Sequence, residues 1–235
     1  FCLVDTQKPE IPASDEPDRV AEAIQRMGLL HAVLTMVARD DLADGGMLHV
    51  AQCVTAIRKV SPLTRIETLI SDVKGTDALD ILLAVKPDVL NHNIETVARL
   101  QRAVRPSAGY ARSLSVLARA KAADLTAKSG LIMGMGETLE EAEGTLVDLA
   151  GVGVDIVTIG QYLRPTTHHL PVARWVEPAE FDHLKKFGEA LGISHVESSP
   201  LTRSSYHARQ SAEEAEQKSI DTAVSLTRKP QPAHK

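Results

Sequence analysis

Residues 126–160 decide the fold, and they read TAKSGLIMGMGETLEEAEGTLVDLAGVGVDIVTIG. Residues 126–134 form an almost continuously apolar run of strand length, which is typical of a strand buried on both faces. Residues 138–150 have the apolar spacing of a helix, and their acidic first turn suits the helix dipole. Residues 154–160 predict a second buried strand. The stretch therefore predicts two parallel strands joined by a right-handed crossover helix.

The same alternation of strand and helix continues in both directions from this unit. Further strands are predicted at residues 31–37, 65–71, 88–93 and 193–197. Helices are predicted at residues 15–27, 47–60, 76–85, 95–104, 113–123 and 178–191. This repetition predicts an α/β fold, and the number of units favours a complete or partial (β/α) barrel over an open doubly wound sheet. No GxGxxG motif follows an early strand, which argues against a dinucleotide-binding fold.

Composition narrows the class of protein further. The 235 residues suffice for one domain with a sizeable core, and 43% of them are hydrophobic. The net charge of -5, without a basic block, argues against nucleic acid as a partner. No apolar run has the length of a membrane span and no leader pattern is present, so we expect a cytoplasmic protein, or an organellar one if a transit peptide has been lost. We expect residues 1–210 to form the barrel and residues 211–235 a charged tail, helical at first and then disordered.

Polar residues follow several predicted strands, where barrel enzymes place their sites. Asp44, Gly45 and Gly46 belong to an acidic loop after the strand at 31–37; it could hold a cationic amine or a metal, or only cap the next helix. Asn93 and Glu95 follow the strand at 88–93. Their side chains could bond a hydroxylated ligand such as a ribose. The alternative for that segment is that Asn93 caps a helix and that the neighbouring histidine is a satisfied core residue.

Three later segments could also contribute to a site. The glycine-rich run at 130–137 could let a flat ring or an anion approach the backbone, or it could be a simple connecting turn. Gln161 and Tyr162 offer an amide and an aromatic ring at a strand end. Two serines beside an arginine at 203–205 could bind an anion or ligate a metal, or form an ordinary turn. Lys128, within a strand, could form a Schiff base.

Eight segments together resemble the lipoyl synthases, which are radical S-adenosylmethionine (SAM) enzymes. The resemblance covers nearly the whole chain to about residue 208, and the order of the segments makes it specific. They are FCLVDT (1–6), VLTMVARDDLADGG (33–46), NHNIET (91–96), RPSAGY (105–110), TAKSGLIMGMGET (126–138), TIGQYLRP (158–165), HLPVARWVEP (169–178) and RSSYHA (203–208).

This resemblance implies a radical-SAM partial (β/α)6 barrel and a sulfur-inserting reaction. The family inserts two sulfur atoms into an octanoyl chain carried on a lysine of a lipoyl carrier domain. It holds two [4Fe-4S] clusters. One, bound by a CxxxCxxC loop, cleaves SAM to a 5′-deoxyadenosyl radical, and the auxiliary cluster supplies sulfur. The implied partners are octanoylated 2-oxoacid dehydrogenase subunits, the glycine cleavage H protein and an electron donor.

The resemblance also assigns site residues. Cys2 matches the third cysteine of the CxxxCxxC loop, and Ser204 or Ser205 matches the oxygen ligand of the auxiliary cluster, with Ser204 favoured. The remaining matches are all to SAM: the methionine amine, the ribose and methionine moieties, and the adenine. They are Asp44, Gly45, Gly46, Asn93, Glu95, Gly134, Glu137, Tyr162 and Leu163.

The other family cysteines and the first barrel strand are absent from this sequence. A single cysteine cannot hold a [4Fe-4S] cluster, so we expect the chain to be an N-terminally truncated form, inactive by itself. Two rival hypotheses keep the barrel. One is a Schiff-base lyase that uses Lys128, and the other is a non-catalytic scaffold, without clusters, that binds SAM or a carrier domain.

Overall fold

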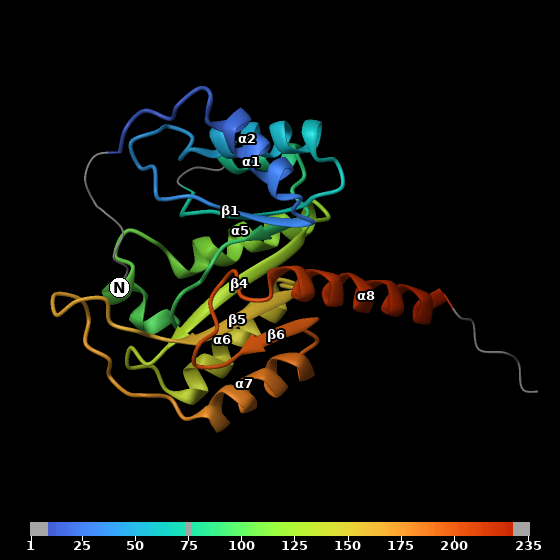
Figure 1. Cartoon of the computed structure of the whole chain (residues 1–235). Helices are drawn as coiled ribbons and strands as arrows, with labels where there is room; N and C mark the ends of the chain where they lie inside the picture. The colour runs from blue at the N-terminus through green and yellow to red at the C-terminus, as the bar shows by residue number, and fades with distance from the viewer. Residues whose placement is uncertain (1–8, 74–76, 228–235) are drawn as a thin grey trace, which may run out of the picture.

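Six parallel strands and the helices between them make up the structure, a computed structural model that describes residues 9–73 and 77–227 (Figure 1). The strands are β1 (His31–Thr35), β2 (Arg65–Leu69), β3 (Val89–Asn91), β4 (Thr126–Met133), β5 (Ile156–Gln161) and β6 (His195–Ser198). The α-helices are α1 (Glu16–Met27), α2 (Met47–Val60), α3 (Asp77–Ala84), α4 (Gln101–Val104), α5 (Tyr110–Ala122), α6 (Leu139–Gly151), α7 (Pro178–Ala190) and α8 (Ala208–Thr227), with a short 3-10 helix at Ala98–Leu100.

The sheet has the strand order β1-β2-β3-β4-β5-β6, and every neighbouring pair is parallel. Within the described residues β1 and β6 do not pair with each other, so the sheet is curved but open. This confirms the predicted α/β partial barrel. Parallel strands all point their carboxyl ends to one edge, which places the segments after β3, β4, β5 and β6 together.

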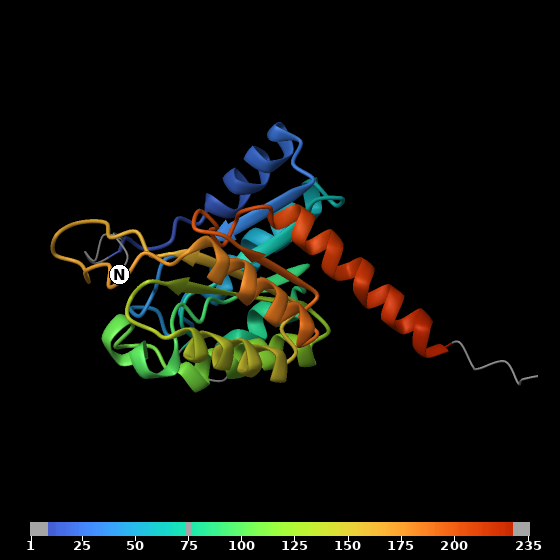
Figure 2. The ribbon, with the colours of Figure 1, turned by 90° about the horizontal axis from the view of Figure 1, so that it is seen from below.

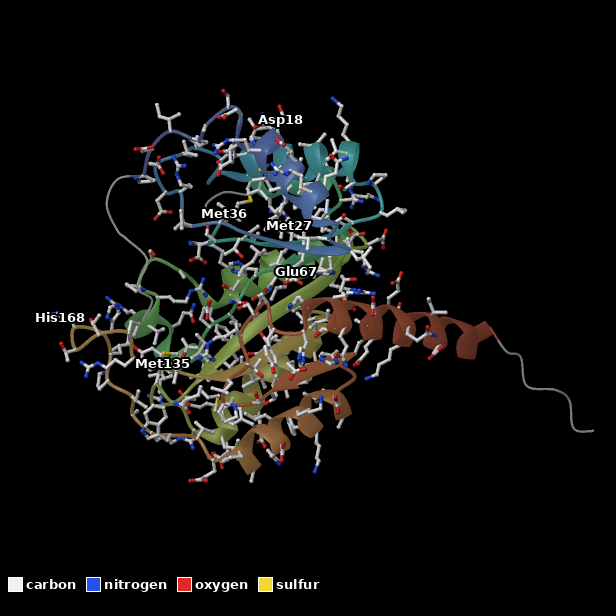
Figure 3. The ribbon with its side chains drawn as sticks, in the orientation of Figure 1. Asp18, Met27, Met36, Glu67, Met135 and His168 are labelled. Carbon is white, nitrogen blue, oxygen red and sulfur yellow. The ribbon has the colours of Figure 1, made fainter. Side chains whose placement is uncertain are left out.

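The main core lies between the sheet and the helices α1, α2, α3, α5, α6 and α7. Alternate strand residues such as Ile66, Leu90 and Val157 pack outward into it. Because side chains alternate along a strand, the residues between them face the inside of the curved sheet. That inner face is unusually polar, and it includes the fully buried Glu67, Asn91 and Lys128. Figure 3 labels Glu67 near the centre of the molecule.

The last helix, α8, lies across the amino ends of the strands. Ala212 and Ala215 are buried against Val89 of β3 and Ile156 of β5. A hydrogen bond of 2.6 Å joins Glu214 Oε2 to Nδ1 of His195 at the start of β6. Figure 2 shows α8 extending away from the sheet beyond this contact. The boundary predicted at residue 210 therefore falls inside a helix whose first half packs against the barrel.

Most predicted elements are confirmed with bounds that shift by a few residues. The helix at 15–27 is α1, which ends at Gly28 with φ +61°, a left-handed conformation suited to glycine. The helix at 138–150 is α6, whose Thr138 and Glu141 form a reciprocal capping box. The end of the tail, which was predicted to be disordered, lies outside the described residues. None of the described helices has the length and apolarity needed to cross a membrane.

The prediction of a helix over residues 95–104 is wrong for its first part. Glu95 has φ +66° and forms a parallel bridge with Leu131, so the chain continues beside β4 after β3 ends. Helical structure begins only at Ala98. The bridge is made of hydrogen bonds from Glu95 N to Gly130 O and from Ile132 N to Glu95 O. Pairing with a neighbouring strand has overridden local helix propensity.

Candidate active site

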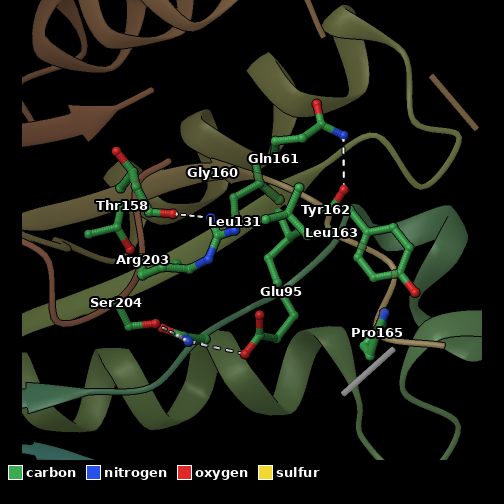
Figure 4. A pocket seen from close by; sticks show the side chains of 14 residues that line it. Glu95, Leu131, Thr158, Gly160, Gln161, Tyr162, Leu163, Pro165, Arg203 and Ser204 are labelled. Carbon is green, nitrogen blue, oxygen red and sulfur yellow. Dashed lines mark hydrogen bonds between the residues drawn. The ribbon is translucent and has the colours of Figure 1, made fainter. Parts of the chain in front are cut away.

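A cavity of about 390 Å³ opens at the carboxyl ends of β4 and β5 (Figure 4). Its size is that of a small-molecule site, and its walls combine apolar side chains with a few polar ones. The wall residues come from the segment after β3, from β4 and β5 themselves, from the segment after β5 and from the loop after β6. They are Asn93, Glu95, Gly130, Leu131, Ile132, Thr158, Gly160, Gln161, Tyr162, Leu163, Pro165, Thr202, Arg203 and Ser204.

Asn93 links two parts of the cavity that are far apart in sequence. Its Nδ2 donates to Glu95 Oε1 at 3.1 Å and to Ser204 Oγ at 2.8 Å (Figure 4). Its Oδ1 is buried and has no hydrogen-bond partner among the residues that the structure describes. Burial raises the pKa of Glu95 although the bond from Asn93 lowers it. A cavity wall with an unused acceptor beside a carboxylate can receive the donor groups of a ligand.

Two glycines leave room for this arrangement. At Gly130 a side-chain Cβ would lie 2.7 Å from Asn93 Oδ1, and at Gly160 it would lie 2.2 Å from the carbonyl oxygen of Thr202. Such distances are well inside van der Waals contact. The loop after β6 therefore rests directly on the backbone of β5, and Asn93 rests on that of β4.

The aromatic side of the cavity is held by a long segment, residues 163–177, which we call the strap. Tyr162 is buried, and its hydroxyl donates to the carbonyl of Leu170 in the strap at 3.0 Å. Gln161 Oε1 accepts from the backbone N–H of Val176 at 2.9 Å, which anchors the other end of the strap. Leu163 is 48% exposed at the cavity mouth. The strap thus presents an apolar surface to whatever enters, and His168 lies at its far tip (Figure 3).

Of the predicted site residues, Asn93, Glu95, Tyr162, Leu163 and Ser204 line this one cavity. Ser205, by contrast, is exposed and lines a separate depression beside α8. The two serines, which the sequence left as alternatives, therefore face different spaces. His92 was predicted to be a core histidine whose ring nitrogens have hydrogen-bond partners. This is confirmed, since His92 is buried and its Nε2 lies 2.9 Å from Ser113 Oγ.

Other predicted residues lie outside the cavity wall. Glu137 accepts the N–H groups of Gly134 and Met135 at 2.5 and 3.0 Å, which shapes the glycine-rich loop after β4. Asp44 accepts the N–H groups of Gly46 and Leu48, at the start of α2. The last two contacts are those expected of a loop that caps a helix.

The cysteines do not form a site within the described residues. Cys2 lies outside them. Cys53 is buried in α2, and burial raises the pKa of its thiol to about 11, which disfavours the thiolate that binds metals. Across the described part of the chain, no group of three or more His, Cys, Asp or Glu side chains is arranged to hold a metal ion.

Lys128 lies inside the barrel and is not part of the cavity wall. Its side chain is fully buried, and Nζ donates to both carboxylate oxygens of Glu67, at 2.9 and 3.1 Å. An amine that is bonded to a carboxylate and closed off from solvent is poorly placed to attack a carbonyl. The geometry does not support a Schiff-base role for this lysine.

Arg105 and Asp72 are not among the predicted site residues, although Arg105 opens the segment RPSAGY (105–110). Arg105 donates to the backbone carbonyls of Asn93 and Ile94, at 3.1 Å each, and to Asp72 Oδ1 at 2.8 Å. Asp72 follows β2, and its position at the carboxyl edge was a signal that could have drawn attention, whereas Arg105 follows α4. The contacts of Arg105 with the backbone carbonyls of Asn93 and Ile94 are ones that no residue pattern reveals.

Sequence comparison places this architecture among known proteins. A profile described as the Radical SAM superfamily matches residues 1–149. A protein named lipoyl synthase from Chlorobaculum tepidum is 52% identical over 211 residues, which cover 88% of this chain and 73% of that protein. Its namesake from Rubrobacter xylanophilus is 52% identical, with 92% and 68% coverage. The one from Xylella fastidiosa is 50% identical, and the chain spans 59% of its length.

Solved structures agree on the fold. Streptococcus suis SuiB bound to S-adenosylmethionine superposes with a TM-score of 0.64 at 8% identity, over 85% of this chain and 46% of that one. HydG, described as a maturase of the [FeFe]-hydrogenase, superposes with a TM-score of 0.61 at 16% identity, over 82% of this chain and 45% of that one. At such low identity these similarities concern the arrangement of strands and helices alone.

Proposed function

Because this chain belongs to the lipoyl synthase family of the radical SAM superfamily, we propose that it forms lipoyl groups by inserting two sulfur atoms into a protein-bound octanoyl chain. The net change is that two C–H bonds of the chain are replaced by two C–S bonds. The observation that carries the proposal is the cavity in which Asn93 joins Glu95 to Ser204, because it brings three of the matched residues together.

The family uses S-adenosylmethionine together with an iron–sulfur cluster. When bound, these supply a radical that removes hydrogen from unactivated carbon. The described residues fit S-adenosylmethionine. Asn93 Oδ1 is a buried acceptor that no other described residue bonds, and Glu95 is a carboxylate in the same wall, so amine and hydroxyl donors of the cofactor would find acceptors there. Gly130 and Gly160 allow Asn93 and the loop after β6 to pack directly against the strands at this wall.

The described residues do not supply the ligands of an iron–sulfur cluster. The roles that remain proposals are those of two [4Fe-4S] clusters, with Cys2 as a ligand of one and Ser204 of the other. That Ser204 lines the cavity and Ser205 does not supports the choice of Ser204. We also propose that two loops lie near the cofactor and act on it through the residues next to them. These are the loop of Gly134 and Glu137 and the loop of Asp44, Gly45 and Gly46.

What this chain's own residues contribute is orientation and exclusion of water. Asn93 fixes the distance between Glu95 and Ser204. The strap, held by Tyr162 and Gln161, covers one side of the cavity with apolar surface and would shield a reactive intermediate from solvent. The exposed Leu163 at the mouth suits an incoming alkyl chain. The proposed partners are octanoylated carrier domains of 2-oxoacid dehydrogenases, the H protein of glycine cleavage and an electron donor.

The test is an assay of the product. The protein is expressed from its gene, reconstituted anaerobically with iron and sulfide, and mixed with dithionite, S-adenosylmethionine and an octanoyl-lysine peptide. We expect mass spectrometry to find a peptide that has gained two sulfur atoms as the dithiol, and that loses two hydrogens when the dithiol is oxidised to the disulfide. S-adenosylhomocysteine in place of S-adenosylmethionine is the negative control.

Two outcomes would contradict the proposal. If S-adenosylmethionine binds but no sulfur enters the peptide, the chain is a binding scaffold. If borohydride traps a covalent adduct on Lys128 when a carbonyl substrate is present, the chemistry is that of a Schiff-base enzyme.

A further inference from the structure

Arg105 holds the backbone that carries both Asn93 and Glu95. Its Nη1 donates to the carbonyl oxygens of Asn93 and Ile94, each at 3.1 Å. The guanidinium is only 11% exposed, so these are charged hydrogen bonds in a largely dry environment. Bonds of this kind are about twice as strong as those between neutral groups. One side chain therefore fixes two successive peptide groups in the wall of the cavity.

The guanidinium is itself held in place from the far side. Its Nη2 donates to Asp72 Oδ1 at 2.8 Å, and the Asp72 side chain is 20% exposed. Asp72 Oδ1 also lies 3.8 Å from Nε2 of the buried His92. Desolvation lowers the pKa of His92 to about 4, so at neutral pH this imidazole is uncharged and does not compete with Arg105 for Asp72. Asp72 and Arg105 form a pair that we call the clamp.

The backbone under the clamp needs such support. Glu95 has φ +66°, a left-handed conformation that residues with a side chain rarely adopt. On one side the bridge to β4 holds it, through Glu95 N to Gly130 O at 2.8 Å. On the other side the clamp holds the two preceding carbonyls. Strained residues of this kind persist only where the surroundings fix them, and they concentrate at functional sites.

We propose that Arg105 is a positioning residue, which sets the conformation of residues 93–95 and thereby the affinity of the cavity for its ligand. Its side chain does not line the cavity, and it acts through the backbone carbonyls of Asn93 and Ile94, the peptide groups that orient Asn93 and Glu95. The identity of the ligand as S-adenosylmethionine rests on the proposed function, but the effect on residues 93–95 does not.

The test compares Arg105→Lys with a matched control, Arg58→Lys. Lysine keeps the positive charge but cannot span two carbonyls and a carboxylate, because it lacks the planar fork of arginine. Arg58 makes the same kinds of contact, with the carbonyl of Lys86 at 2.7 Å and Asp88 Oδ2 at 3.2 Å, but next to the start of β3, at the opposite end of the sheet. Both variants lose bonds from a guanidinium to a backbone carbonyl and a carboxylate, although Arg105 makes more of them and is more buried, and only Arg105 is near the cavity.

Two readouts are needed. Hydrogen exchange of the ligand-free proteins measures the opening of the amides of Glu95 and Thr96, and we expect about tenfold faster exchange in Arg105→Lys and no change there in Arg58→Lys. Calorimetric titration with S-adenosylmethionine and S-adenosylhomocysteine is expected to show an affinity about tenfold lower in Arg105→Lys, a difference of about 1.4 kcal/mol. Asp72→Asn should produce the same two changes to a smaller extent.

The results distinguish the proposed S-adenosylmethionine site from the positioning role of Arg105. If the unaltered protein binds neither compound, the proposed cofactor site fails, and the exchange data alone decide whether the clamp exists. If the unaltered protein binds and Arg105→Lys binds equally well, Arg105 has no positioning role for the ligand. Equal exchange in the Arg105→Lys and unaltered proteins would overturn the clamp itself. If Arg105→Lys fails to fold, Asp72→Asn carries the comparison.

Discussion

At the scale of single residues, the site depends on backbone positions that ordinary residues would not tolerate. Gly130 and Gly160 are places where the chain approaches its neighbours too closely for a side chain. Glu95 adopts a left-handed conformation. The sequence pattern pointed to the glycines and to the carboxylate of Glu95, but it did not predict their backbone conformations or their close contacts. The contacts that require them come from segments distant in sequence, and a single sequence does not show which segments meet.

Gly160→Ala tests the close approach of the loop after β6. The added methyl group would lie 2.2 Å from the Thr202 carbonyl, which is backbone and cannot rotate away, so residues 202–204 must move out of the cavity. We expect a loss of stability of about 1–3 kcal/mol, measured by urea unfolding, together with loss of ligand binding. The control is Gly144→Ala in α6, where no atom lies within 4 Å and alanine should stabilise the helix by roughly 0.5–1 kcal/mol. Equal stability of the Gly160→Ala and unaltered proteins would contradict the packing described.

Glu95→Gln tests the balance between stability and function in the cavity. Burial raises the pKa of Glu95 in the folded protein, so the folded chain is destabilised by the ionised carboxylate at neutral pH. Because the folded pKa exceeds the unfolded one, this loss is absent below the unfolded pKa and develops as pH rises through the folded pKa. Glutamine keeps the acceptor for Asn93 and carries no charge. We expect a higher melting temperature than that of the unaltered protein at pH 7, no difference at pH 3.5, and weaker ligand binding.

The melting temperatures are to be measured without ligand, since a ligand that binds only the folded form would mask the effect. A variant that melts lower at pH 7 would show that the carboxylate contributes to folding.

At the scale of elements, α8 connects the base of the barrel to the site. The helix begins at Ala208, four residues after Ser204, and it is fixed to the amino ends of β3, β5 and β6. The loop after β6 must therefore cross from one end of the sheet toward the other within a short segment. The composition of residues 211–235 predicted a charged tail. The buried alanines of α8 are too few and too small to give a clear amphipathic pattern, which is why their packing was not foreseen.

Ala212→Leu tests this anchoring. Ala212 is fully buried against Val89 and Ile156, so a larger side chain has no space and must displace the helix. We expect a stability loss of about 1–3 kcal/mol in urea unfolding and weaker ligand binding, because Ser204 moves with the helix. Gln217→Leu, on the exposed side of the same helix, is the control and should change stability by less than about 0.5 kcal/mol. Similar effects of the two substitutions would argue against a buried anchor.

Strands and long helices were predictable because their apolar periodicity is local. The bounds of α2 at Met47–Val60 agree with the prediction, and those of α6 and α7 differ by one residue. The segment after β3 was predicted as a helix because its local pattern is compatible with one. Its extended path follows from the bridge to Leu131, a contact across 36 positions of the chain that local propensity cannot encode.

At the scale of the whole molecule, the inside of the barrel is polar well below the cavity. Glu67 is surrounded by Lys128, Asn91 Nδ2 at 2.8 Å and His31 Nε2 at 3.6 Å. Burial opposes ionisation of Glu67, but these groups lower its pKa below the usual value. Because both charges are removed from water, the desolvation cost is large and is met only while the partners remain together. The polar interior therefore constrains how the strands from β1 to β4 can be arranged.

A double-mutant cycle on Glu67 and Lys128 tests this constraint. Lys128→Met leaves an unpaired carboxylate in the interior and should cost about 3–5 kcal/mol in urea unfolding. Glu67→Gln leaves an unpaired ammonium and should cost a similar amount. In the double variant no charge remains, and the glutamine can still accept from Asn91, so we expect most of the loss to be recovered. If the double variant is as unstable as the sum of the single ones, the two side chains do not form an interacting pair, and the interior is held by packing instead.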